Sequence, residues 1–339
     1  MLQIGEKLGN GQFGEVFRAV DQVHGSVAVK IISRNTEESN DDWGVRKSRF
    51  LNEAQNLAKA THQNVVRVFH LTASEDGQSV RICMEICEKG SLQSRFDEGP
   101  MPLSDIRSIA TDVVMGLGAL HARGMLHRDI KPGNILLDGR RAKLGDFGLV
   151  TDELILGYGS IAGYSDHVAY EVWRGRGTSS KSDIWALGMT FYRLLHGASW
   201  YEEDVTIGER AENGGLANGL RWLPHVPKRW RRLIREMLCE DTERRIPTAL
   251  AVQNRLADLP ISPDWTCTVS ADSVKWQRDV KLRRQIVEWE RRSDKKHKWI
   301  ARSEPKGKGI SRKLDGSVDW VNKAQAIRGL EDFFAGLLS

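Results

Sequence analysis

The fold of this chain is decided by two neighbouring runs of residues, His127-Arg128-Asp129-Ile130-Lys131-Pro132-Gly133-Asn134 and Gly145-Asp146-Phe147-Gly148. The aspartate of the second run stands twelve positions after the asparagine that ends the first. Between them lie two short apolar runs, residues 135–137 and 142–144, which are typical of a pair of short strands. This ordered set of Asp, Lys and Asn side chains is the most specific signal in the sequence.

A glycine-rich element, Gly9-Asn10-Gly11-Gln12-Phe13-Gly14, lies far upstream of these runs. In a dinucleotide-binding fold, such an element connects a strand to a helix. Here a second strand-like run, residues 15–20, follows the glycines instead. Glycines between two strands allow the backbone to close over phosphate groups, and the element therefore favours a phosphate-covering flap.

Lys30 ends a short apolar run and is followed by Ile31-Ile32. The simplest alternative is a surface lysine at the end of a strand, but its apolar neighbours on both sides argue against exposure. A buried lysine needs a partner for its charge. Glu53, on the helix expected next, is the natural partner, and the pair can hold the ammonium group against nucleotide phosphates.

Together these residues resemble the protein kinase family, which carries the same motifs in the same order. The resemblance spans about residues 4–258 and implies an enzyme that uses ATP and Mg²⁺ to phosphorylate a protein substrate. It implies that Asp129 accepts or orients the proton of the substrate hydroxyl, and that Asn134 and Asp146 bind Mg²⁺. Their oxygen atoms are the ligands that this hard cation prefers.

Lys131 distinguishes between subclasses of that family. A lysine two residues after the catalytic aspartate, in contact with the γ-phosphate, is the pattern of serine/threonine kinases. Tyrosine kinases place their basic residue later in the loop. The resemblance therefore implies a serine/threonine kinase.

The resemblance also places the nucleotide site. Met84 occupies the gatekeeper position, and Glu85, Ile86 and Cys87 form the hinge whose backbone contacts adenine. The other nucleotide-site residues that it implies are Leu8, Gly9, Gly11, Gly14, Val16, Ala28, Lys30 and Leu136.

Further landmarks of the family occur in register. Asp183 begins a helix and is expected to brace the catalytic loop, while Glu171 and Arg245 match a buried ion pair. Three more residues match the stack that assembles in the active conformation: Leu57, His127 and Phe147.

The segment of residues 163–171 departs from the family pattern G-T-x-x-Y-x-A-P-E. Tyr170 replaces the proline, and Tyr164 stands where the family has a threonine. These changes leave ATP and Mg²⁺ binding untouched but make the segment that faces the substrate unusual.

Arg128 precedes the catalytic aspartate, as in kinases whose activation segment is ordered by a phosphate–arginine pair. We therefore expect autophosphorylation on one or more of the segment's serine and threonine hydroxyls, which are Thr151, Ser160 and Ser165. Alternatively, a carboxylate supplies the negative charge, from Asp152, Glu153 or Asp166.

The composition is that of a soluble globular protein, with 40% hydrophobic and 28% charged residues among 339. No apolar run approaches the roughly 20 residues that cross a bilayer, and the N-terminus lacks a secretory signal. We expect a cytoplasmic protein without a membrane partner. Its four cysteines are expected to be reduced thiols. Cys83 and Cys87 have loose zinc-ligand spacing, but because no second Cys/His pair follows, no metal is expected there.

The predicted fold class is α+β, with a strand-rich N-terminal lobe and a helical C-terminal lobe. We expect a kinase domain over residues 1–258, a linker over 259–264 and a small α+β module over 265–339. Among the expected elements are strands at residues 65–69 and 80–85 and helices from Ser104 to His121 and from Ser182 to Leu195, closed by Gly197. The module is expected to form four strands and a final helix over residues 324–338.

The C-terminal module carries 17 Lys/Arg against 10 Asp/Glu and five of the eleven tryptophans. One interpretation is a basic aromatic surface that binds nucleic acid. We favour a second, in which the tryptophans form the core of a sheet with charged residues on its outer face. A third use, docking the substrate or a regulator of the kinase, suits the position of the module equally well.

Two functions other than protein phosphorylation are alternatives for such a sequence. A pseudokinase scaffold would use the fold for binding alone, but Lys30, Glu53, Asp129, Asn134 and Asp146 are all intact. A phosphotransferase with a non-protein acceptor usually lacks the D-F-G run and the activation-segment ion pair, both of which have counterparts here.

Overall fold

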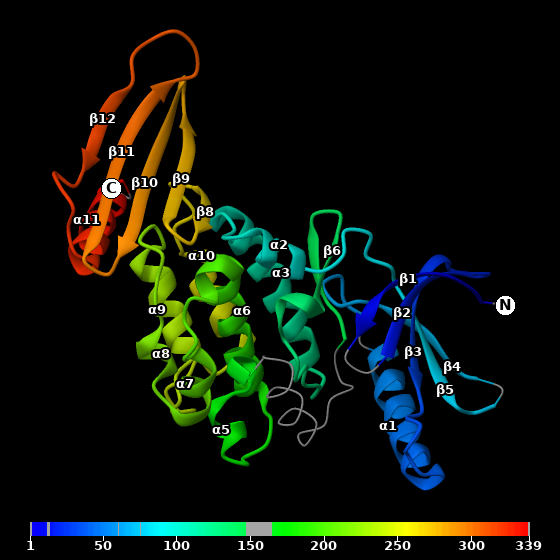
Figure 1. The fold of residues 1–339 in the computed structure, drawn as a ribbon. Helices are drawn as coiled ribbons and strands as arrows, with labels where there is room; N and C mark the ends of the chain where they lie inside the picture. The colour runs from blue at the N-terminus through cyan, green and yellow to red at the C-terminus, as the bar shows by residue number, and fades with distance from the viewer. Residues whose placement is uncertain (1, 12–13, 60, 75, 147–164, 338–339) are drawn as a thin grey trace.

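The computed structural model describes residues 2–11, 14–59, 61–74, 76–146 and 165–337, with backbone alone for 49 and 52–59. Two lobes and a C-terminal module follow one another along the chain (Figure 1). The predicted α+β class and the two-lobed architecture are confirmed. Within the described residues, no helix combines the length and apolar character needed to cross a membrane.

The N-terminal lobe is an antiparallel five-stranded sheet in the order β1-β2-β3-β5-β4. Its strands are β1 (Gln3–Gly11), β2 (Gly14–Asp21), β3 (Gly25–Ser33), β4 (Val68–Ala73) and β5 (Ser79–Met84). The helix α1 (Asn40–Lys59) packs against β4 and β5. The strand expected at 65–69 is wrong in its position. Val65 and Val66 instead contact Leu144 of the other lobe through backbone bonds, because both side chains are buried in the core there.

The helical lobe is built around two long helices, α3 (Leu103–His121) and α6 (Ser180–Tyr201). Around them lie α2 (Gln93–Glu98), α5 (Tyr170–Trp173), α7 (Ile207–Asn213), α8 (Leu216–Gly219), α9 (Lys228–Met237), α10 (Ala249–Ala257) and the hairpin of β6 (Ile135–Asp138) and β7 (Arg141–Leu144).

Two helix starts differ from prediction. Ser104 is not the N-cap of α3, because Pro102 holds that position and the Ser104 hydroxyl hydrogen-bonds Asp264. The helix α6 begins two residues before its expected start at Ser182, at Ser180, because Ser179 and Ser182 form a capping box. Gly197 interrupts α6 with a φ of 68°, as expected of a helix-ending glycine.

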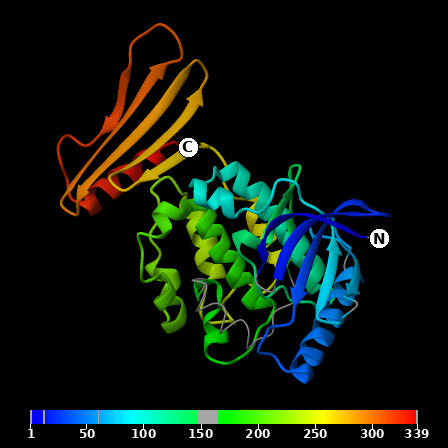
Figure 2. The ribbon, with the colours of Figure 1, turned by 45° about the vertical axis from the view of Figure 1, so that its right-hand side comes forward.

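The C-terminal module is an antiparallel sheet in the order β12-β11-β10-β9-β8, with α11 (Lys323–Ala335) across one face (Figure 2). Its strands are β8 (Thr266–Ser270), β9 (Ser273–Val280), β10 (Arg283–Ser293), β11 (Lys296–Pro305) and β12 (Arg312–Gly316). The sequence did not predict β12. Four of its five residues are exposed and three of these are charged, so the strand lacks the alternation of apolar and polar residues that marks the others.

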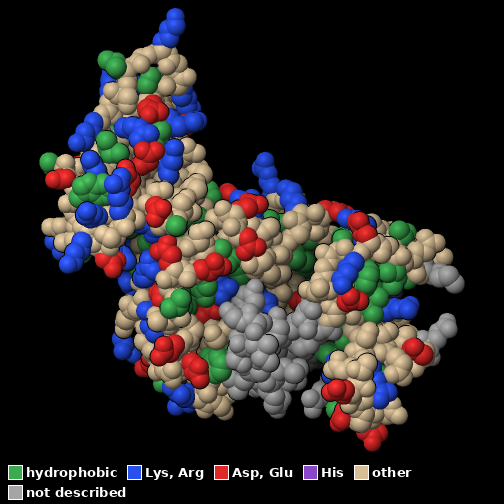
Figure 3. Space-filling model, in the orientation of Figure 1, with side chains coloured by type: hydrophobic (Ala, Val, Ile, Leu, Met, Phe, Trp, Pro, Cys, Tyr) green, Lys and Arg blue, Asp and Glu red, His purple; other side chains and the backbone are tan. Residues whose placement is uncertain are grey.

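The core interpretation of the tryptophans is confirmed for four of the five: Trp265, Trp276, Trp289 and Trp299 are buried. Trp320 is partly exposed, with the Arg292 guanidinium 4.5 Å from its ring centroid. On the face of the module seen in Figure 3, Lys and Arg side chains are scattered among uncharged and acidic ones.

The module and the helical lobe share one continuous apolar core. The Trp289 ring lies 6.3 Å from that of Trp200 in α6, centroid to centroid. At the edge of this junction, Arg291 pairs with Glu203 at 2.9 Å, and Arg231 of α9 pairs with Glu331 of α11. The module is therefore packed on the lobe and is not held by its linker alone.

Replacing Trp289 with alanine should lower the free energy of unfolding of the helical lobe as well as that of the module. Removing a buried tryptophan costs about 3–5 kcal/mol because it leaves a cavity. Urea unfolding followed by circular dichroism measures the change, and Trp320→Ala is the matched control, expected to change little. A separate transition for the module, with the main transition unshifted, would contradict the shared core.

Candidate functional site

A cavity of about 420 Å³ lies between the N-terminal sheet and the helical lobe. This volume lies in the range of small-molecule sites. Its lining includes eight residues assigned to the nucleotide site from the sequence: Leu8, Gly9, Val16, Ala28, Met84, Glu85, Cys87 and Leu136. Lys131, Asn134 and Asp146 line the same cavity, so one space joins the apolar residues to the polar ones.

The glycine-rich element connects β1 to β2, where Gly11 pairs with Gly14 across the hairpin. A Cβ atom on Gly14 would lie 2.1 Å from the carbonyl oxygen of Ile31 in β3. Only glycine therefore allows β2 to start this close to β3. The strand–turn–strand arrangement agrees with the prediction of a flap, not of a helix N-terminus.

Lys30 is 1% exposed, and its Nζ lies 2.8 Å from Oδ1 of Asp146. Asp146 has a φ of 53°, a left-handed conformation that non-glycine residues seldom adopt. This conformation directs its carboxylate towards Lys30 and the cavity. Glu53 lies on α1, but its side chain is outside the described residues, as are those of Leu57 and Phe147.

In the loop that follows His127, two predicted residues, Lys131 and Asn134, contact the carboxylate of a third, Asp129. Lys131 Nζ lies 2.8 Å from Asp129 Oδ2, and the Asn134 side-chain amide donates to that oxygen at 2.7 Å. The same amide group donates to the Asp129 carbonyl at 2.8 Å. Among the described residues, Asp129 Oδ1 accepts no hydrogen bond, which leaves it as the oxygen that can receive a proton.

Asp183 braces this loop from beneath. Its carboxylate, 1% exposed, accepts the backbone N–H groups of His127 at 2.9 Å and Arg128 at 2.8 Å, and His121 Nε2 lies 2.9 Å away. Arg128 has a φ of 67°, so the loop turns sharply at that residue. Burial lowers the pKa of His127, which keeps its ring neutral within the loop.

The predicted ion pair of Glu171 and Arg245 is present and bidentate, with both N···O distances 2.7 Å. Arg245 is 1% exposed and lies 5.0 Å from the ring centroid of Trp185. The pair joins the segment after residue 164 to the loop before α10. A buried bidentate pair of this kind is costly to break, because one charge would be left without a partner.

A second buried network was not found from the sequence. Asp166 pairs with Arg193 at 3.0 Å and accepts the hydroxyl of Tyr201 at 2.9 Å. Burial alone would raise the pKa of Asp166, but Arg193, His167 and Tyr201 outweigh it and lower that pKa. Next to it, His167 Nδ1 donates to the carbonyl of Ile130 in the catalytic loop at 2.8 Å. Nothing in the sequence pairs Asp166 with a residue 27 positions away.

The comparisons with known proteins agree with this geometry. Residues 2–256 match the family model described as protein kinase domain. The serine/threonine-protein kinase PrkC of Bacillus subtilis is 31% identical over 255 residues, 73% of this chain and 38% of that protein. Calcium-dependent protein kinase 2 of Arabidopsis thaliana is 33% identical over 72% of the chain and 38% of its own length. The chain thus spans less than half of each of these relatives.

Lowering the pH from 7 to 5 should destabilise the fold through His167. Burial, with a smaller effect of Arg193, lowers the pKa of His167 from 6.5 to about 4. The unfolded chain therefore binds a proton that the folded chain refuses, and stability is lost as pH falls below 6.5. The loss between these pH values is about 2 kcal/mol.

Urea titrations of wild type and His167→Gln at both pH values measure this effect. Glutamine keeps an N–H donor for the Ile130 carbonyl but does not titrate, so the variant should lose about 2 kcal/mol less than the wild type. An identical loss in both proteins would show that His167 is already protonated in the folded state.

Proposed function

Because this chain belongs to the protein kinase family, we propose that it is a serine/threonine protein kinase that transfers the γ-phosphoryl group of ATP to protein hydroxyls. The observation that carries this proposal is the group of Asp129, Lys131, Asn134 and Asp146 beside an apolar cavity of nucleotide size. The catalytic and binding roles of individual residues are part of the proposal.

The nucleotide is assigned to the cavity. Val16, Ala28 and Leu136 would enclose the purine, with the backbone of the hinge after Met84 providing hydrogen bonds. The flap of Gly9, Gly11 and Gly14 would cover the phosphates, and Lys30 would neutralise part of their charge. Lys30 lies at the right depth, since its ammonium group already reaches Asp146.

Asn134 and Asp146 would hold Mg²⁺. Both Asn134 contacts above use its N–H groups, so its amide oxygen is the atom available to a cation. With a carboxylate oxygen of Asp146, this makes a set of hard oxygen donors, as the ion requires. When bound, Mg²⁺ neutralises charge that builds up on the transferred phosphoryl group.

Asp129 would orient the acceptor hydroxyl and take up its proton through Oδ1. Lys131 shares the other oxygen of that carboxylate, so the lysine lies where it can also contact the γ-phosphate. In this arrangement the acceptor hydroxyl, the carboxylate of Asp129 and the ammonium group of Lys131 would lie side by side. The proposed preference of the enzyme for serine and threonine rests on Lys131.

A pseudokinase is disfavoured because these side chains are assembled and not merely present in the sequence. A phosphotransferase with a non-protein acceptor is disfavoured by the bidentate Glu171–Arg245 pair, which supports a protein-docking segment. We assign the protein substrate to the surface around residues 165–171. In this segment Tyr170 stands where the family has a proline, so we expect the substrate-binding surface to differ from that of other family members.

Asp129→Ala should lower the rate of phosphoryl transfer about 10²- to 10⁴-fold, the usual contribution of a general base. Nucleotide affinity should stay nearly unchanged, because Asp129 is not part of the cavity lining. Phosphate incorporation into a protein substrate, analysed for phosphoserine, phosphothreonine and phosphotyrosine, measures the first, and calorimetry with Mg-ADP measures the second. Asp105→Ala is the control, since that carboxylate is on the surface. Undiminished transfer by Asp129→Ala would refute the proposal.

Autophosphorylation is expected between Asp146 and Glu171. Thr151 and Ser160 lie outside the described residues, whereas the Ser165 hydroxyl is packed so closely on Gly208 that an added Cβ would lie 2.5 Å from it. We therefore expect phosphate on Thr151 or Ser160 before Ser165. Mass spectrometry after incubation with Mg-ATP identifies the site, with Asp129→Ala as the unmodified control. Full activity with no phosphate in this segment would contradict the expectation.

A further inference from the structure

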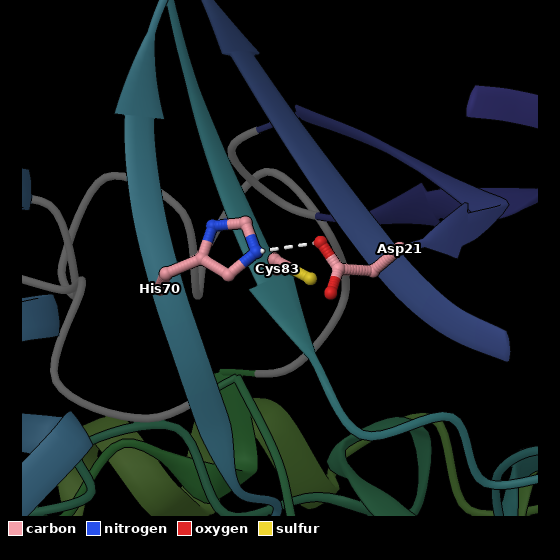
Figure 4. A group of neighbouring side chains, drawn as sticks. All are labelled: Asp21, His70 and Cys83. Carbon is pink, nitrogen blue, oxygen red and sulfur yellow. Dashed lines mark hydrogen bonds and ion pairs between the residues drawn. The ribbon is translucent and has the colours of Figure 1, made fainter. Parts of the chain in front are cut away.

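Three side chains with metal-binding atoms meet on the outer face of the N-terminal sheet (Figure 4). They are Asp21 at the end of β2, His70 on β4 and Cys83 on β5. Their nearest ligand atoms all lie within 4.8 Å of one another. No step proposed for phosphoryl transfer uses any of them.

Strand register explains why they share a face. Residues directly opposite each other in an antiparallel pair point to the same side. His70 is opposite Cys83, and Cys83 is opposite Val29. Lys30 is opposite Ile82 and therefore points to the other side, towards the nucleotide cavity. Asp21 lies two residues after Ala19, which packs with Val29 and Cys83 in the small outer core.

An irregularity in β4 also places His70. The register shifts between Val68 and His70, which is the effect of a β-bulge, and bulges redirect side chains. As a result His70 stands beside Cys83 with its Nε2 3.0 Å from Asp21 Oδ2.

The carboxylate of Asp21 is held in a fixed orientation. Its Oδ1 accepts the backbone N–H groups of Val23 and His24, each at 2.9 Å, which leaves Oδ2 directed towards His70. The hydrogen bond from the His24 backbone, with those from His70 and Val23, lowers the pKa of Asp21 to about 2. Asp21 is therefore ionised at neutral pH.

We propose that Asp21, His70 and Cys83 form a zinc site on the outer face of the N-terminal lobe. Thiolate, imidazole and carboxylate are the ligands of Zn²⁺ in proteins, and the thiolate disfavours Mg²⁺ and Ca²⁺. With metal–ligand distances of about 2.0–2.3 Å, tetrahedral ligand atoms lie about 3.3–3.8 Å apart. The present separations, all within 4.8 Å, exceed the upper end of this range by at most about 1 Å.

The protons balance as follows on binding. Burial raises the pKa of the Cys83 thiol to about 11, so the metal-free thiol is protonated and Zn²⁺ displaces one proton to solvent. His70 would bind the metal through Nε2, and a proton on that nitrogen would pass to Nδ1 or to solvent. The metal replaces the hydrogen bond between His70 and Asp21, and no redox step is involved.

The site has a closed side and an open side. Cys83 is 1% exposed, whereas the His70 side chain is 37% exposed. Three protein ligands leave the fourth position facing solvent, where water completes the tetrahedron. Because the ligands come from three strands, the bound metal would clamp β2, β4 and β5 together behind the strand that carries Lys30.

The sequence predicts no metal at the pair of Cys83 and Cys87, and the group proposed here does not include Cys87. Cys87 lines the nucleotide cavity instead. The partners of Cys83 lie 62 and 13 positions upstream, at Asp21 and His70, with no motif to connect them. A simple alternative is that Cys83 is only a small core residue and that His70 only bonds the turn at Asp21.

Metal titration of the full chain distinguishes a zinc site from this simple alternative. Chelator-treated wild type is titrated with Zn²⁺ by calorimetry and with Co²⁺ by absorption spectroscopy. We expect one metal per chain, a thiolate-to-cobalt charge-transfer band and the visible bands of four-coordinate Co²⁺. The melting temperature should rise with Zn²⁺.

Two variants test the ligands, His70→Gln and Cys83→Ala. Glutamine keeps a hydrogen-bond donor for Asp21, and alanine keeps the outer core apolar. Each should weaken binding by more than about 100-fold, the upper end of what loss of an outer-shell partner costs. Cys239→Ser, at a thiol on the helical lobe, is the matched control and should bind as wild type does.

A wild type that binds neither metal stoichiometrically overturns the proposal, and so does binding that both variants retain. Circular dichroism of the metal-free proteins confirms that the variants are folded. If Cys83→Ala does not fold, Asp21→Asn takes its place, because asparagine keeps the acceptor for the turn but lacks the charge.

Discussion

The buried carboxylate of Asp183 is the constraint on which the active loop depends. Two successive backbone N–H groups, of His127 and Arg128, donate to it, and they hold the loop in a sharp left-handed turn at Arg128. Asp129 follows immediately, so its direction is set by these two bonds. A buried carboxylate needs such donors, since burying it without partners is very costly. The same two hydrogen bonds therefore orient the proposed catalytic aspartate and provide partners for the buried carboxylate of α6.

The helical lobe extends this constraint to the surface around residues 165–171, where we propose that the substrate binds. Arg245 holds Glu171, Arg193 holds Asp166, and His167 donates to the carbonyl next to Asp129. The catalytic loop and the segment after residue 164 are thus tied together by polar contacts in a buried setting. Such networks are rigid when every member has its partner.

Strand β3 divides the N-terminal lobe into two chemical faces. On one face Lys30 reaches Asp146, and on the other Val29 packs beside Cys83 and the proposed zinc ligands. Consecutive residues of this strand therefore point to opposite faces of the sheet. The C-terminal module is joined to the helical lobe through its core, because its tryptophans belong to the same apolar cluster as residues of α6. Among the residues that the structure describes, none of the outer face or of the module lines the cavity between the lobes.

The sequence by itself determined the family and the two-lobed order of elements, and it predicted most of the residues that line the cavity between the lobes. It could do so because those residues occur in runs such as residues 127–134, where spacing along the chain preserves spacing in space. Only the tertiary structure decided the Asp166–Arg193 network, the position of β4, the strand β12 and the meeting of Asp21, His70 and Cys83. Each of these depends on strand register or on contacts between distant segments, which local periodicity does not encode.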